Sequence, residues 1–417
     1  MKLFTLFAAA CVLAASAHAA PSSFGQPLPA AANAAVRTSS YITMPDGTRL
    51  AADIYRPSKD GVALPGKFPV ILHATAARTR LGDTDERSGT GRFSTQMINL
   101  ASHGYVFVAV ERRGIAASFG VRRGYHDRIE AQDSQDLIAW AARQPWSDGK
   151  VGGYGCSNTG DAAMHFLTLP SPHLKAVFAG CFNWDKYSGG MRGGVLANWG
   201  TGPQGSMERD MASTPVDGDE NKVLLRQAAE QHAANTVMLD LWSGMPYRDS
   251  VSPLTGTAFW EEGSIGTYLK QVKANNIPVY VQGGWNDDFR AQGFIVLANL
   301  PTAKLVIGPW GHCDSGVGLK SLFARQVELA GIAHVGHAAS QLGAEPCDLV
   351  DLPGVVHALS GRHRLEIDAG LHHHGDHAAP GAVQAVDEEG AARHRGARPA
   401  RPAMRRAGRT DFPSRPS

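Results

Sequence analysis

A serine in a glycine-rich turn is the residue of this sequence whose surroundings point most directly to chemistry. It stands in the stretch Gly153-Tyr154-Gly155-Cys156-Ser157-Asn158-Thr159-Gly160, between a predicted strand and a predicted helix. A serine at a sharp strand-to-helix turn needs small neighbours, and Gly155 and Gly160 are such neighbours. Thr159 stands where the strict G-x-S-x-G pattern has its second glycine. The stretch therefore predicts a nucleophile at Ser157, and an ordinary glycine-rich turn is the alternative.

An aspartate and a histidine follow Ser157 in the chain order that a serine nucleophile requires. A serine hydroxyl becomes a useful nucleophile when a base removes its proton and a carboxylate orients that base. Asp287 and His312 each follow a predicted buried strand, and parallel α/β sheets place their sites at the carboxyl ends of strands. We therefore expect Asp287 to orient His312, and His312 to act as the general base for Ser157.

The elements that must position these side chains alternate between strand and helix. Continuous apolar runs, which are typical of strands buried on both faces, cover residues 68–72, 105–110, 151–154, 174–179, 279–281 and 305–307. Helical spacing covers residues 94–101, 130–144 and 161–167, and an antiparallel pair with a turn at 45–47 covers residues 40–56. This alternation predicts an α/β fold with a parallel sheet.

A helical segment interrupts the predicted sheet. Between residues 183 and 276 the pattern changes to helices and loops, and one continuous helix is predicted from Asn221 to Trp242. The buried-strand pattern then resumes. We therefore expect a sheet domain in two parts, residues 20–182 and 277–329, with a helical cap at 183–276 inserted between them.

Composition and charge exclude several classes of protein. The 417 residues are 43% hydrophobic and carry a formal net charge of +2, which excludes wholesale disorder and removes the electrostatic argument for nucleic-acid binding. After residue 19 the cysteines are Cys156, Cys181, Cys313 and Cys347, and none are spaced as C-x-x-C, so no zinc site is predicted. An oxidising compartment permits disulfides, but the sequence does not give a pairing, so we expect small buried thiols at these positions.

The first nineteen residues have the pattern of a signal peptide. Lys2 is the basic start, residues 3–15 form the apolar run, and Ala17-His18-Ala19 is a small-x-small cleavage site. The apolar run is shorter than the roughly 20 residues that span a bilayer, and no later segment has the pattern of a membrane span. We therefore expect cleavage after Ala19 and export, to the periplasm or to the exterior.

Residues 330–417 differ from the rest of the chain in composition. They are rich in Ala, Gly, Arg and Pro and contain no Lys, Asn, Trp or Tyr. Too few large apolar side chains are present to offset the entropy of ordering, so no fold is expected there. A shifted reading frame in a GC-rich gene would produce this bias, and a natural tail of unusual composition is the alternative.

Three further groups of residues are assigned no chemistry. The tract His372-His373-His374 is expected to be solvated rather than to bind a metal ion. The basic run at 393–409 is balanced by acidic residues elsewhere in the tail, so no nucleic-acid partner is expected. Glu111, Arg112 and Arg113 are expected to form a structural charge cluster below the site.

Several motifs, in order along the chain, resemble those of one enzyme family. Besides the turn at Ser157 they are Met44-Pro45-Asp46-Gly47-Thr48-Arg49-Leu50, Asp53-Ile54-Tyr55-Arg56-Pro57, Arg113-Gly114 with Ser118 and Gly120, Gln144-Pro145-Trp146-Ser147-Asp148-Gly149-Lys150-Val151-Gly152, Gly284-Trp285-Asn286-Asp287 and Gly308-Pro309-Trp310-Gly311-His312. Over residues 38–325 the chain resembles the CocE/NonD hydrolases. This is the X-Pro dipeptidyl-peptidase-like family that includes cocaine esterase and α-amino-acid ester hydrolases.

The resemblance implies an α/β-hydrolase fold and an acyl-enzyme mechanism without a cofactor or a metal ion. It implies Ser157 as nucleophile, His312 as general base and Asp287 as orienting acid. Asp288 is the rival for the acid, and the family's G-W-x-D spacing favours Asp287. The backbone N–H of Asn158 would then meet the oxyanion. A small-molecule ester and an X-Pro peptide both remain open as the substrate.

Two departures from the family's pattern motivate an alternative function. The family places a tyrosine, a second oxyanion donor, after the first buried strand, whereas residues 73–78 read His-Ala-Thr-Ala-Ala-Arg. Loss of one such donor raises a reaction barrier by on the order of 3 kcal/mol. The family also continues into a jelly-roll domain, and residues 330–417 show no pattern of one. The alternative is therefore a non-catalytic or crippled remnant of such a hydrolase.

Overall fold

The computed structural model describes residues 33–76, 91–197, 206–301, 303–313 and 356–359, with the backbone alone at 91–96 and 356–359. All of them belong to the first of two compact units, Met1–Gly370. The leader predicted at residues 1–19 lies outside the described residues. So does the predicted tail after residue 330, apart from four residues. The predictions for these segments, and the predicted domain boundaries, stay predictions.

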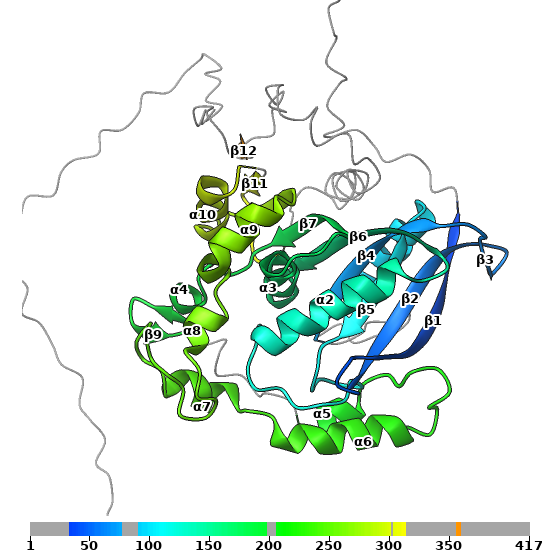
Figure 1. Cartoon of the computed structure of the whole chain (residues 1–417), viewed down its shortest axis with the longest axis horizontal. Coiled ribbons are helices and arrows are strands. Elements are labelled where there is room, and N and C mark those ends of the chain that lie inside the picture. The colour runs from blue at the N-terminus through cyan, green and yellow to red at the C-terminus, as the bar shows by residue number, and fades with distance from the viewer. Residues whose placement is uncertain (1–32, 77–90, 198–205, 302, 314–355, 360–417) are drawn as a thin grey trace, which may run out of the picture. The chain divides into compact units, whose positions relative to one another are not determined.

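A ten-stranded sheet forms the centre of the described residues (Figure 1). The strands are β1 (Ala34–Thr43), β2 (Arg49–Lys59), β3 (Val62–Ala63), β4 (Phe68–Thr75), β5 (Val106–Glu111), β6 (Ser147–Cys156), β7 (Leu174–Gly180), β10 (Val279–Gly284), β11 (Ala303–Gly308) and β12 (Val356–Leu359). Their order is β1-β2-β5-β4-β6-β7-β10-β11-β12, and β3 pairs with β2. Neighbours from β5 to β11 are parallel, whereas β1, β2 and β12 extend the sheet by antiparallel pairing. The predicted parallel α/β sheet is confirmed.

Helices cover both faces of the sheet because its central strands are apolar on both faces. They are α1 (Gly91–Ser102), α2 (Arg128–Ala142), α3 (Asn158–His165), α9 (Leu269–Asn275) and α10 (Gln292–Asn299). Leu137, Met164 and Val296 belong to the core of one face, and Leu100 to that of the other. No helix within the described ranges is long and apolar enough to cross a membrane.

Short helices and loops between β7 and β10 form the predicted cap. They include α4 (Lys186–Gly190), the hairpin β8 (Met191–Arg192) and β9 (Val195–Leu196), α5 (Met207–Met211), α6 (Val223–Gln231), α7 (Met238–Ser243) and α8 (Phe259–Glu262). A core of its own, in which Trp242 and Trp260 lie 5.5 Å apart between ring centroids, packs this segment. In Figure 1 the cap helices α5, α6, α7 and α8 lie along one side of the sheet.

The prediction of a single helix from Asn221 to Trp242 is wrong, because the helical conformation is interrupted at Asn235. α6 ends at Gln231, a 3-10 turn follows, and Asn235 adopts an extended backbone with ψ of 140° before α7 begins. The Asn235 side chain accepts a hydrogen bond from the Arg122 backbone N–H at 2.6 Å and donates one to the Gly114 carbonyl at 2.9 Å. The Thr236 backbone N–H also donates to the Arg122 carbonyl, at 3.0 Å, so this loop of the sheet domain holds the interruption of the helix in place.

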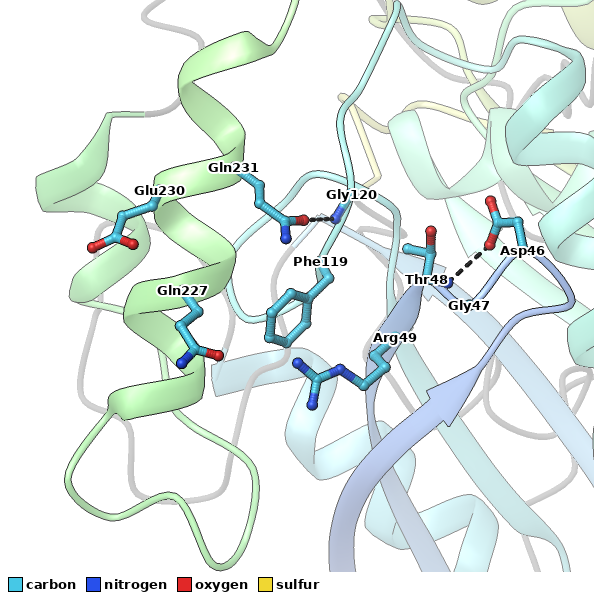
Figure 2. Close-up of a pocket in the computed structure, with 9 residues that line it drawn as sticks. All are labelled: Asp46, Gly47, Thr48, Arg49, Phe119, Gly120, Gln227, Glu230 and Gln231. Carbon is cyan, nitrogen blue, oxygen red and sulfur yellow. Dashed lines mark hydrogen bonds between the residues drawn. The ribbon is translucent and has the colours of Figure 1, made fainter.

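A pocket of about 710 Å³ lies where α6 meets the turn between β1 and β2. Figure 2 shows Gln227 and Gln231 of α6 on one side of it and Arg49 with Phe119 on the other. The Arg49 guanidinium lies 3.9 Å from the centroid of the Phe119 ring, and the Gln231 side chain accepts a hydrogen bond from the Gly120 N–H at 2.8 Å. The pocket lies between the cap and the sheet domain. None of its lining residues is one of the three predicted catalytic residues.

Asn235→Ala should loosen the attachment of the cap to the sheet domain. The substitution leaves the Arg122 N–H and the Gly114 carbonyl without these partners. We expect the free energy of unfolding to fall by about 1–3 kcal/mol, measured by urea denaturation. Gln227→Ala, at an exposed position of α6, is the control and should change it by less than about 0.5 kcal/mol. Equal losses for the two variants would contradict this role of Asn235.

Candidate active site

Ser157 occupies a sharp turn between β6 and α3. Its backbone has φ of 60° and ψ of −129°, a left-handed conformation that residues other than glycine rarely adopt. Two backbone hydrogen bonds of 2.9 Å hold it: the Ser157 N–H donates to the Gly180 carbonyl, and the Ser157 carbonyl accepts from the Asp161 N–H. Hydrogen bonds to the neighbouring strand and to the first turn of α3 therefore hold Ser157 in its strained conformation. The side chain of Ser157 lines a pocket.

The small residues around Ser157 are required by close contacts. A Cβ atom on Gly160 would lie 2.6 Å from the Gly180 carbonyl oxygen, and one on Gly155 would overlap the Thr159 carbonyl. Thr159 fits at the second glycine position of the pattern because its hydroxyl bonds back to Cys156. The hydroxyl donates to the Cys156 carbonyl at 2.8 Å and accepts from the Cys156 N–H at 2.9 Å. Thr159 thus reinforces the turn although the strict pattern has glycine at this position.

The structure brings the three predicted catalytic side chains into one hydrogen-bonded chain. Asp287 follows β10 and His312 follows β11. His312 Nε2 lies 2.7 Å from Ser157 Oγ, and His312 Nδ1 lies 2.9 Å from Asp287 Oδ1. The Asp287 side chain is 2% exposed, whereas the His312 side chain is 43% exposed. The rival acid, Asp288, is 63% exposed and pairs instead with Arg192 at 2.9 Å.

The hydrogen bonds to Asp287 keep its carboxyl ionised. Burial by itself would raise its pKa, but hydrogen bonds from His312 and from the Cys181 thiol outweigh burial and lower the pKa. A carboxylate in this state accepts the Nδ1–H of the imidazole and leaves Nε2 free to accept a proton. The arrangement can therefore draw a proton from the Ser157 hydroxyl.

The predicted oxyanion donor, Asn158, lies at the start of α3 and lines the pocket. Its side-chain oxygen accepts a hydrogen bond from Arg112, which also pairs with Glu130 at 2.9 Å. Sequence reasoning placed Arg112 in a structural cluster and missed this contact beside Ser157. The position of Arg112 directly after β5, at the carboxyl edge of the sheet, could have indicated this contact. Of the stretch predicted to lack the oxyanion tyrosine, residues 77–78 lie outside the described residues.

The other two members of the expected charge cluster serve the loop that follows β5. The Glu111 carboxylate accepts a hydrogen bond from the Ala117 N–H at 2.9 Å. Arg113 pairs with Asp133 at 2.6 Å and with Asp46 at 2.7 Å. The loop between β5 and α2 is thereby tied to α2 and to the turn between β1 and β2.

Ser157, Asp287 and His312 open into a pocket of about 470 Å³. Cap residues and loop residues form apolar walls: Tyr125, Met238, Trp242 and Phe289. Asp161, Asn183 and Lys186 give the same pocket a polar part. Lys186 Nζ lies 2.9 Å from Asp161 Oδ2, and the Asn183 backbone N–H donates to Asp161 Oδ1 at 2.5 Å. The pocket therefore combines an apolar surface with a buried ion pair.

Comparison with known proteins decides the family. The model of the X-Pro dipeptidyl-peptidase family, S15, matches residues 46–314. The chain belongs to this family. The resemblance to the CocE/NonD hydrolases is confirmed by the same match and by the relatives described next.

Two curated relatives of the S15 chain are named as esterases. A Mycobacterium bovis protein named as a serine esterase is 29% identical over 325 residues, covering 66% of this chain and 51% of that protein. The cocaine esterase of a Rhodococcus species is 26% identical over 308 residues, covering 68% of this chain and 50% of that protein. The S15 chain thus spans about half the length of the curated relatives it matches.

A solved structure confirms the α/β-hydrolase fold. The CocE/NonD family hydrolase of Staphylococcus aureus superposes with a TM-score of 0.53 at 19% identity. The match covers 73% of this chain and 51% of that structure. At this identity the likeness establishes the fold of the S15 chain and nothing finer.

The expectation of buried free thiols is wrong for two of the cysteines. Cys156 and Cys313 form a disulfide with Cα atoms 6.0 Å apart. They are 157 positions apart in sequence, so no local spacing could have indicated the pair. Cys181 is a buried free thiol, as expected, and Cys347 lies outside the described residues.

Two groups of described side chains come close enough to hold a metal ion. One contains Cys156, Cys181 and Cys313, and the other contains Cys181, Asp287 and His312. In the first group two of the three sulfurs are joined in the disulfide. In the second group the carboxylate and the imidazole bond to each other. Neither group, as it stands, presents a set of free ligands.

Two stacked histidines lie below the pocket. The rings of His126 and His165 are 5.7 Å apart at 11°, and His126 Nε2 lies 3.7 Å from Asp161 Oδ2. Burial lowers the pKa of His165 to about 4, and burial together with the nearby Lys186 and Arg112 charges lowers the pKa of His126 well below its ordinary value. Both rings are therefore neutral at neutral pH.

In the variant His165→Gln, the free energy of unfolding should fall less steeply with falling pH in mild acid. Between the ordinary histidine pKa of 6.5 and the folded pKa of about 4, the unfolded chain binds a proton that folded His165 excludes. Stability therefore falls as the pH falls through this window. Removing one such group should reduce the slope of the free energy of unfolding against pH by about 1.4 kcal/mol per pH unit. Urea denaturation at pH of about 5 and 6 measures this slope. At pH of about 7.5 the slope should not change, and a change there would contradict the assignment to His165.

Proposed function

We propose that the S15 chain is a serine hydrolase that cleaves carboxylic esters through an acyl-enzyme. The observation that carries the proposal is the chain of hydrogen bonds from Ser157 Oγ to His312 at 2.7 Å and from His312 to Asp287 at 2.9 Å. The strained backbone at Ser157 supports it, because such strain persists where a function depends on it. The curated relatives named as esterases also support it.

In the proposed reaction Ser157 Oγ attacks the ester carbonyl as His312 Nε2 takes the hydroxyl proton. Asp287 holds the opposite ring nitrogen and stabilises the imidazolium. The backbone N–H of Asn158, at the first residue of α3, donates to the developing oxyanion. His312 returns the proton to the leaving alcohol, and the acyl group stays on Ser157. A water that gives its proton to His312 then releases the acid.

The charges of the pocket favour an ester with an apolar acyl group over an X-Pro peptide. A dipeptidyl peptidase must hold the free α-ammonium group of its substrate, and a carboxylate is the natural partner for that group. Among the described residues, each carboxylate that lines this pocket has a partner at 2.9 Å: Asp161 has Lys186, Asp287 has His312, and Asp288 has Arg192. The apolar walls supply the surface that an uncharged acyl group would bury.

We also propose that the chain acts after export. The leader pattern at residues 1–19 motivates this location. The Cys156–Cys313 disulfide supports it, because disulfides persist mainly in oxidising compartments. The proposed reaction uses no cofactor.

Ser157→Ala and Asp287→Asn should abolish most of the ester hydrolysis, whereas Asp288→Asn should retain it. Removing the nucleophile should lower kcat by at least about a thousandfold, and Asp287→Asn should do so by up to about ten-thousandfold. The measurement is hydrolysis of p-nitrophenyl acetate, with fluorophosphonate labelling of the serine as an independent check. Asp288→Asn is the matched control. No labelling of the wild-type chain would favour the alternative of a non-catalytic remnant.

A pair of ethyl esters tests the substrate class. Ethyl 3-phenylpropionate and phenylalanine ethyl ester differ in one ammonium group beside the same ester bond. We expect kcat/KM to be at least about tenfold higher for 3-phenylpropionate, because the described carboxylates of the pocket are already paired and would not be free to bind a buried ammonium. A preference for phenylalanine ethyl ester would overturn the proposed substrate class and leave the triad assignment intact.

A further inference from the structure

Three sulfur atoms converge beside the triad, and each belongs to a cysteine next to a different triad member. Cys156 immediately precedes Ser157, and Cys313 immediately follows His312. Cys181 Sγ lies within 4.8 Å of a carboxylate oxygen of Asp287 and within 4.8 Å of the sulfurs of Cys156 and Cys313. Two triad members are therefore sequence neighbours of a cysteine in this cluster, and the third lies within 4.8 Å of one.

The topology of the sheet explains why the connection is needed. β6 and β11 are separated by β7 and β10, which corresponds to three strand spacings of about 4.8 Å, or roughly 14 Å. The Cα atoms of Cys156 and Cys313 are nevertheless only 6.0 Å apart. The chain after β11 must therefore cross back over the ends of β10 and β7 to bring His312 to Ser157. The disulfide fixes the far end of that crossing.

Within the described residues, the side-chain contacts of His312 other than its hydrogen bond to Ser157 go to the loop after β10. Asp287 and Phe289, whose ring centroid lies 5.4 Å from that of His312, both belong to the loop after β10. The hydrogen bond from His312 to Ser157 must be broken and remade in every catalytic cycle. The disulfide is thus a permanent link between the loop of the base and the strand of the nucleophile.

Cys313 itself is held in an unfavourable conformation. Its φ of 53° lies in the left-handed region that non-glycine residues avoid. The backbone N–H of Cys313 donates to Cys181 Sγ at 3.3 Å, and its own sulfur bonds to Cys156. Cys181 in turn donates its backbone N–H to the Gln282 carbonyl of β10 at 3.1 Å. Sulfur contacts therefore fix the backbone that carries the imidazole.

We propose that the Cys156–Cys313 disulfide is a positioning element for the proposed ester hydrolysis, holding His312 Nε2 at Ser157 Oγ. The inference rests on the proposed function. The apolar pocket walls come from the loop between β5 and α2, the cap and the loop after β10, and neither Cys156 nor Cys313 lies in these segments, so breaking the disulfide should leave them in place. The loss should therefore fall on kcat rather than on KM. A displacement of about 1 Å at the reacting atoms corresponds to a fall of about a hundredfold.

The first experiment compares wild-type protein with the double variant Cys156→Ala/Cys313→Ala. Active-site titration with a fluorophosphonate counts the reactive serines, so kcat is expressed per titrated site and unfolded molecules do not contribute. We expect kcat per site to fall by about tenfold to a hundredfold, with KM for p-nitrophenyl acetate changing by less than about threefold. A purely structural disulfide would reduce the number of titrated sites and leave kcat per site unchanged, which would overturn the proposal.

The second experiment keeps the wild-type sequence and therefore does not depend on the folding of a variant. Tris(carboxyethyl)phosphine supplies two electrons to the disulfide, and one water supplies the oxygen of the phosphine oxide and the protons of the two thiols that form. We expect the reduced, still folded wild-type chain to lose kcat to the same extent, and reoxidation to restore it. The double variant is the control, and its activity should not respond to the phosphine.

These outcomes separate the two proposals. If the oxidised wild-type chain neither hydrolyses the ester nor reacts with the fluorophosphonate, the proposed function itself fails. If the oxidised chain is active and the reduced chain has the same kcat per site, the positioning role of the disulfide alone fails.

Discussion

The candidate site depends on the carboxyl edge shared by the parallel strands β6, β7, β10 and β11. Parallel strands all end at the same edge, so the residues that follow them meet in space however far apart they lie in sequence. Ser157 and His312 are 155 positions apart and lie within hydrogen-bond distance of each other. The apolar faces of these strands, packed between helices, provide the rigidity with which that distance is kept.

The strained turn at Ser157 and the cap complete the site in different ways. The turn requires glycine at positions 155 and 160, where a Cβ atom would clash, and the Thr159 hydroxyl adds two hydrogen bonds to it. The cap contributes apolar wall residues such as Met238 and Trp242, which belong to the core of the cap and take no part in the hydrogen-bonded chain. In the proposed reaction, recognition of the acyl group and the attack on its carbonyl would therefore be supported by separate parts of the fold.

Sequence reasoning succeeded where a local pattern determines the structure. Continuous apolar runs predicted the central strands, and the order of Ser157, Asp287 and His312 behind strand ends predicted which residues meet. It failed where a distant contact decides. Helical spacing continues through Asn235, yet its side chain bonds to the loop at Arg122 and ends the helix. The Cys156–Cys313 pair and the contact of Arg112 with Asn158 likewise join segments that no spacing rule connects.

The disulfide also changes the covalent topology of the chain. The whole cap lies between Cys156 and Cys313, so the cap and the strands β7, β10 and β11 belong to one closed covalent ring. A protease that cut one exposed cap loop would open the ring and would not divide the molecule. Ser157 and His312 would stay on a single covalent framework after such a cut, and two cuts within the ring would be needed to release any fragment of it.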